Sequence, residues 1–164
     1  MAGQREVVVL SGVRTAIGDY GGSLKDFAPT DLAARVVKEA VARAQVDPND
    51  VGQCIFGNVI HTEPKDMYLS RVACVKGGLP VTTGSLTLNR LCGSGMQAIV
   101  SASQYILLGD IDAAVAGGAE SMSRAAYMNT TQRWRNSRPS SPRSVRASRR
   151  SGSDGQDRRR GRSE

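Results

Sequence analysis

Hydrophobic positions recur with two spacings along the first 127 residues, and each spacing predicts one kind of element. Apolar residues at helical spacing, bounded by proline and glycine, predict helices at residues 29–44, 67–76 and 96–108. Short apolar or alternating runs predict strands at residues 6–10, 54–56, 85–88 and 113–116. Strands and helices therefore alternate, which predicts an α/β fold with a mostly parallel sheet covered by helices.

Two of these elements carry predictions for single residues. The run at residues 6–10 is β-branched without polar alternation, so it predicts a strand buried on both faces. Pro29-Thr30-Asp31 opens the first helix, with Thr30 expected as the N-cap and Asp31 in the first turn. The apolar face of that helix is expected to consist of Leu32, Val36, Val37, Ala40, Val41 and Ala44.

A cysteine stands where a predicted strand passes into a predicted helix, in the stretch Asn89-Arg90-Leu91-Cys92-Gly93-Ser94-Gly95. Its glycines allow a sharp turn and leave little bulk around the sulfur of Cys92. At a helix start the macrodipole and unpaired N–H groups favour the thiolate, and those N–H groups, that of Cys92 included, could face an oxyanion. Cys92 is therefore a candidate nucleophile, and the alternative is a buried cysteine that only packs. Gly117 and Gly118 would let the last predicted strand pass close to this turn.

The stretch around Cys92 resembles the acyl-accepting cysteine motif of the thiolases, the enzymes that make or cleave 3-ketoacyl-CoA. Four further stretches resemble thiolase signatures in family order and spacing: residues 11–18, 21–24, 57–59 and 117–123. The resemblance runs from about Val7 to about Tyr127 and is greatest to the bacterial biosynthetic or broad-chain β-ketothiolases. It implies the N-terminal part of a thiolase-like fold.

The resemblance also implies a reaction in two halves. Cys92 would attack an acyl-CoA thioester to give an acyl-enzyme, and a deprotonated acetyl-CoA would then attack the acyl group in a Claisen condensation, or thiolysis would run in reverse. Coenzyme A thioesters are then substrates, and neither a separate cofactor nor a metal is expected. Family members of full length are homo-oligomers.

Several family features have no counterpart in these 164 residues. They are the inserted domain with most CoA contacts, the Asn-Glu-Ala-Phe segment, the histidine of a Gly-His-Pro motif, and the second cysteine that takes part in the family's reaction. The one histidine, His61, lies in a loop-like stretch that does not match Gly-His-Pro, so we do not assign it the role of base. We therefore expect a truncated, inactive fragment in which acylation is slow or absent and condensation is absent.

The remaining cysteines and the lengths of the apolar runs argue against a disulfide-rich or membrane protein. Cys54 and Cys74 lie inside apolar runs and are expected to pack, and an odd cysteine count argues against a disulfide framework. No apolar run is long enough to span a bilayer, and residues 1–6 contain no signal-peptide core. We therefore expect a cytoplasmic protein without a membrane partner.

The net charge of +7 belongs to the C-terminal tail. Residues 1–131, the predicted partial thiolase domain, contain 11 Lys+Arg and 12 Asp+Glu, or −1; residues 132–164 contain 11 and 3, or +8. This Arg-, Ser-, Gly- and Pro-rich tail is predicted to be disordered. It could bind nucleic acid or an anionic surface, be a solvated tail without function, or be an out-of-frame reading of a thiolase gene. We favour the last because composition shifts where the resemblance ends, so nucleic acid is not expected as a partner.

An interaction role is a further alternative. A half-sheet with an unpaired edge tends to associate. A partial family domain also exposes apolar surface that the remainder of a longer chain would cover. Concentration-dependent association would favour this alternative over an enzymatic one.

Overall fold

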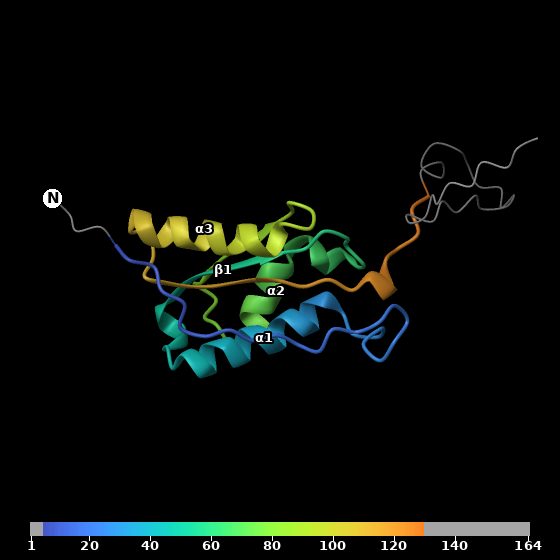
Figure 1. Cartoon of the computed structure of the whole chain (residues 1–164), viewed down its shortest axis with the longest axis horizontal. Helices are drawn as coiled ribbons and strands as arrows, with labels where there is room; N and C mark the ends of the chain where they lie inside the picture. Colours follow the sequence, from blue (N-terminus) through green and yellow to red (C-terminus); the bar gives the residue numbers. More distant parts are fainter. Residues whose placement is uncertain (1–4, 130–164) are drawn as a thin grey trace, which may run out of the picture. The chain divides into compact units, whose positions relative to one another are not determined.

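A three-stranded parallel sheet forms the centre of the structure, a computed structural model that describes residues 5–129 (Figure 1). Its strands are β1 (Val51–Gly57), β2 (Gly84–Leu88) and β3 (Ala113–Gly118), in the order β2-β1-β3. The chain divides into two compact units after Ala126, and the sheet belongs to the first. The predicted boundary at residue 131 and the predicted disordered tail lie outside the described residues.

Helices cover both faces of this sheet. α1 (Pro29–Ala44) and α2 (Leu69–Lys76) pack together on one face, whereas α3 (Ser94–Leu108) lies alone on the other, against β1 and β3 (Figure 1). The short 3-10 helices are η1 (Pro48–Asp50), η2 (Pro64–Tyr68) and η3 (Met122–Arg124). The predicted α/β class with a parallel sheet is confirmed. Among residues 5–129, no helix combines the length and apolar character needed to cross a bilayer.

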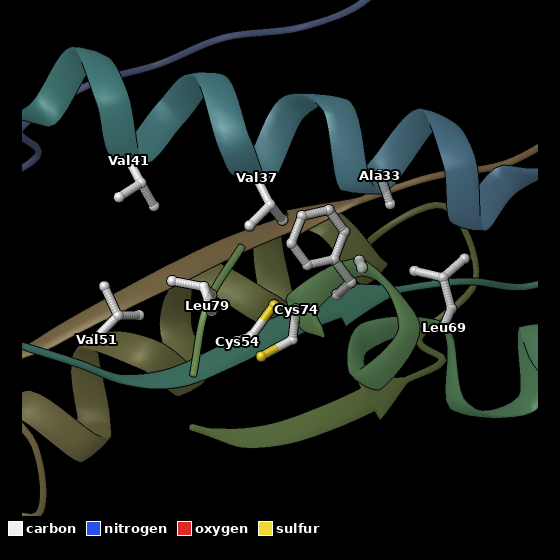
Figure 2. Close-up of a cluster of buried hydrophobic side chains, with 10 residues drawn as sticks. Ala33, Val37, Val41, Val51, Cys54, Leu69, Cys74 and Leu79 are labelled. Atoms are coloured by element: carbon white, nitrogen blue, oxygen red, sulfur yellow. The ribbon is translucent and has the colours of Figure 1, made fainter. Parts of the chain in front are cut away.

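The larger hydrophobic core lies between the sheet and the α1–α2 layer (Figure 2). It consists of Ala33, Val37, Val41, Val51, Cys54, Phe56, Leu69, Ala73, Cys74 and Leu79. Cys54 of β1 and Cys74 of α2 lie next to each other, fully buried (Figure 2). Burial raises the pKa of the Cys54 thiol far above its ordinary value, and the Cys74 thiol raises it further. The prediction that these two cysteines pack is confirmed.

The predicted strand at residues 6–10 is wrong. These residues form no strand, and Val8, Val9 and Leu10 are exposed. The segment lines a groove of about 980 Å³ together with residues of β3, α1 and α3. It belongs to no strand of the sheet and so has no ladder partner. β-branched residues favour extended backbone, but a strand forms only where a neighbouring strand lies at hydrogen-bonding distance.

The buried face of α1 is shifted from the predicted one. Ala33 and Ala34 are buried, whereas Val36 and Ala40, predicted to face the core, are partly buried, although Val36 still packs against the core. β3 is half-buried, and it borders the same groove. The sheet therefore ends at β3 with an open flank.

The predicted cap of α1 is also wrong. The helix begins at Pro29 with Ala28 as its N-cap, so Thr30 lies inside the first turn, and its buried hydroxyl has no hydrogen-bond partner. Proline suits the first helical position because its fixed φ is helical and it lacks the N–H that would be unpaired there. Asp31 does lie in the first turn, where it pairs with Lys76 at 2.8 Å.

The burial of the three cysteines predicts how they react. Cys92 is exposed, whereas Cys54 and Cys74 are buried. We expect titration with an aromatic disulfide reagent to find one reactive thiol in the native chain, none in Cys92→Ser, and three in the denatured chain. Rapid reaction of two or three thiols under native conditions would contradict the packing described here.

Candidate active site

The carboxyl ends of the three parallel strands lie at one edge of the sheet, and the loops that follow them meet there. The amide of Asn58, just after β1, donates to the carbonyl of Leu88 at the end of β2 at 3.1 Å. The amide of Ala119, just after β3, donates to the carbonyl of Gly57 at 3.1 Å. Ligands of open parallel α/β sheets bind at this edge. The loop from β2 into α3 carries Cys92 to it.

Cys92 lies on a tight turn that is held by its own backbone. Gly93 donates to the carbonyl of Arg90 at 3.1 Å, and Ser94 donates to that of Leu91 at 3.0 Å. Leu91 has a φ of 49°, a left-handed conformation that costs a residue other than glycine roughly 1–2 kcal/mol. The strain lies one residue before the exposed thiol, and a site that retains such strain must hold it by surrounding contacts.

Ser94 supplies one of those contacts. Its hydroxyl accepts from the amide of Arg90 at 2.8 Å and donates to the carbonyl of Leu91 at 2.7 Å. Ser94 is 5% exposed, and α3 begins at this residue with Gly93 as N-cap, two residues before the predicted start. Ser94 was predicted only as a member of the stretch around Cys92. A polar residue where a strand passes into a helix is the sequence feature that could have indicated its role.

Glycines permit the turn to pack against the sheet. A Cβ on Gly57 would lie 2.5 Å from the Cβ of Ser94, a distance that real side chains do not adopt. A Cβ on Gly118 would lie 3.7 Å from the Cα of Gly95. The predicted approach of the end of β3 to the cysteine turn is therefore confirmed at Gly118, whereas Gly117 lies against the ring of Phe56.

A carboxylate joins the ends of β1 and β3. Glu120 accepts from the amides of Val59 at 2.9 Å and Ile60 at 3.0 Å, and from Nδ2 of Asn58 at 3.1 Å. Nδ2 of Asn58, which is 1% exposed, also donates to the carbonyl of Ala119 at 2.9 Å. Glu120 therefore fixes the loop that follows β1.

That loop in turn contacts the residues before Cys92. Nδ2 of Asn89 donates to the carbonyl of Val59 at 3.4 Å, and Oδ1 of Asn89 accepts from the amide of Leu91 at 2.9 Å. A chain of hydrogen bonds thus runs from Glu120 to the strained residue beside the thiol. Asn58, Asn89 and Glu120 entered the sequence analysis only as members of family-like motifs.

The chain matches the family model described as "Thiolase, N-terminal domain" over residues 7–148, which is more than half of its length. The chain belongs to the thiolase family. The resemblance of the motifs around Cys92 and at residues 117–123 is thereby confirmed at the level of the family.

Individual relatives agree. The thiolase-family chain is 68% identical over 130 residues to beta-ketothiolase BktB of Cupriavidus necator, covering 79% of this chain and 33% of that protein. The crystal structure of the Bacillus anthracis acetyl-CoA acetyltransferase superposes with a TM-score of 0.74 at 41% identity, covering 77% of this chain and 32% of that one. Human mitochondrial 3-ketoacyl-CoA thiolase in complex with CoA gives 0.71 at 40%, covering 76% and 32%. This chain therefore spans about a third of the length of these relatives.

His61 lies where the sequence analysis expected it, in the exposed loop between β1 and η2. No hydrogen bond or ion pair joins its side chain to the other described residues, so nothing in this thiolase domain orients it toward Cys92. Within residues 5–129, no three His, Cys, Asp or Glu side chains gather so as to hold a metal ion.

The contact of Gly57 with Ser94 predicts a large effect for a single methyl group. We expect Gly57→Ala to lower the free energy of unfolding by about 1–3 kcal/mol, because the turn must move away from β1. Gly12→Ala is the matched control, since a Cβ there meets no atom within 4 Å. Equal urea denaturation midpoints for the two variants would show that the contact is absent.

The role of Glu120 is testable with an isosteric change. Glu120→Gln turns one acceptor oxygen into a donor that faces another donor, so we expect a loss of about 1–3 kcal/mol in urea denaturation. Glu39→Gln breaks only the exposed pair with Arg43 and should cost at most about 0.5 kcal/mol. Equal losses in the free energy of unfolding for Glu120→Gln and Glu39→Gln would contradict this role of Glu120.

Proposed function

We propose that Cys92 accepts the acyl group in a thiolase-type acyl transfer. The thiolate attacks the carbonyl carbon of an acyl-CoA thioester, a bond forms from sulfur to the acyl group, and coenzyme A leaves as its thiolate. The observation that supports this role is the exposed thiol of Cys92, which lies on a strained turn at the carboxyl edge of the sheet, just before α3. The names of relatives support the substrate class, since they act on acetyl-CoA or 3-ketoacyl-CoA.

The start of α3 supplies part of the electrostatics. The positive end of the helix dipole stabilises negative charge on the sulfur and on the carbonyl oxygen under attack. The amides of Gly93 and Ser94 already donate to loop carbonyls, so they do not serve as oxyanion donors in this conformation. The amide of Cys92 itself and the first-turn amides of Gly95 and Met96, for which the helix offers no acceptor, are the donors that remain at this end.

The rate at which Cys92 is acylated is limited by removal of the proton from its thiol. A cysteine nucleophile needs a base to remove its proton or an environment that holds the thiolate. The one histidine of these 164 residues, His61, makes no contact that directs it to the thiol. This chain is therefore proposed to acylate slowly and not to condense, because the Claisen step also needs a base at the methyl carbon of acetyl-CoA.

The wider activity is proposed for a protein of family length. Such a protein condenses two acetyl-CoA, or acyl-CoA with acetyl-CoA, to 3-ketoacyl-CoA, or runs thiolysis in reverse. Coenzyme A thioesters are its substrates, with no separate cofactor, and it is a homo-oligomer in the cytoplasm. Nucleic-acid binding through residues 132–164 stays an alternative prediction, because that tail lies outside the described residues.

Intact mass after incubation with acetyl-CoA tests the acyl-acceptor role. We expect a slow acetyl adduct on the native chain and on Cys74→Ser, and none on Cys92→Ser. Cys74→Ser is a matched control because it removes a buried thiol and leaves the exposed one. An adduct of equal yield on Cys92→Ser, or no adduct on a chain shown to be folded by circular dichroism, would refute the proposal.

A further inference from the structure

A single positive charge lies beside the candidate nucleophile. Arg90 is the one charged side chain among residues 77–109, and it stands two residues before Cys92. Both side chains are exposed. None of the ion pairs among residues 5–129 includes Arg90. The guanidinium charge is therefore not cancelled by a carboxylate of the described part of the chain.

Neutral contacts hold the Arg90 side chain against the start of α3. Its Nη1 donates to Oε1 of Gln97 at 2.7 Å, and Nε2 of Gln97 donates to the hydroxyl of Ser101 at 3.2 Å. Cγ and Cδ of Arg90 lie 3.9 Å from the position that a Cβ on Gly93 would take. Gly93 and Gln97 share one face of the helix, because they are four residues apart. The amide of Gln97 thus orients the guanidinium along this face without cancelling its charge.

The carboxylate at this edge of the sheet is engaged elsewhere. Glu120 accepts hydrogen bonds from two amides and one side-chain Nδ2 of the loop after β1, so its negative charge is already stabilised by donors. A positive charge at a solvent-exposed site acts over about 10 Å at 0.1 M salt. The charge of Arg90 is therefore felt by groups that react at Cys92 and not by distant parts of a reactant.

We propose that Arg90 determines a specificity of Cys92, namely a preference for reactants with negative charge next to the reacting carbon. In the acyl transfer proposed above, the same guanidinium favours the oxyanion that forms on the thioester carbonyl, and this part of the inference rests on the proposed function. The preference itself does not rest on it, because every electrophile that reaches the sulfur of Cys92 meets the same charge.

Alkylation by iodoacetate and by iodoacetamide tests this preference. With both reagents the sulfur displaces iodide and forms a thioether, and the reagents differ in that one carries a carboxylate. The ratio of the two rate constants cancels the reactivity of the thiol, since the same thiolate attacks both. We expect the ratio of iodoacetate to iodoacetamide to fall about two- to fivefold in Arg90→Gln at low salt and to be retained in Arg90→Lys. The native ratio should also fall as salt is added.

A second variant tests the same charge without removing Arg90. Gln97→Glu keeps the shape of the side chain and places a carboxylate on the guanidinium, so the ratio should fall as it does in Arg90→Gln. Two matched controls should retain the native ratio. Lys38→Gln removes an exposed positive charge from α1, and Gln104→Glu adds a carboxylate at an exposed position farther along α3. Circular dichroism checks that each variant is folded.

Two results would overturn the inference. One is an unchanged ratio in folded Arg90→Gln or Gln97→Glu, and the other is an equal fall in Lys38→Gln. The acyl-acceptor role fails separately. An acetyl adduct on Cys92 without a charge preference would refute the role of Arg90 alone. A charge preference without an acetyl adduct would support that role and refute acyl transfer to Cys92.

Discussion

The candidate site depends on one close contact, the approach of the Ser94 side chain to the backbone of Gly57. Because Gly57 has no side chain, the turn that carries Cys92 can pack directly on the carboxyl end of β1. Ser94 uses the position to bond the backbone on both sides of Leu91, and so holds a left-handed φ that would otherwise relax. This turn carries the exposed thiol of Cys92 just before the start of α3.

Much of the fold followed from periodicity. The strands at residues 85–88 and 113–116 and the helix at 29–44 were found because each is a local pattern with a clear stop. The strand predicted at residues 6–10 is absent. Its β-branched residues favour extended backbone, but that preference does not show whether a neighbouring strand lies within hydrogen-bonding distance. Thr30 was misplaced for a similar reason, since proline at the first helical position outweighed its capping preference.

The site was predictable only in part. The joint of strand, glycine and helix located Cys92, and its exposure excludes the alternative of a buried packing cysteine. The role of Glu120 was not predictable from pattern, because it bonds backbone groups about sixty residues earlier in the chain. The strain at Leu91 was equally hidden, since nothing about a leucine suggests a left-handed φ. Family-like motifs named these residues without saying what they do.

In the proposed reaction the folded turn, and not merely a free thiol, makes Cys92 an acyl acceptor. The most direct test is the rate of acetyl transfer from acetyl-CoA to Cys92, followed by mass spectrometry in the native chain and in the chain unfolded by urea at the same pH. We expect faster transfer in the native chain, because the α3 dipole and the fixed turn exist only there. Equal rates, or faster transfer in the unfolded chain, would contradict it.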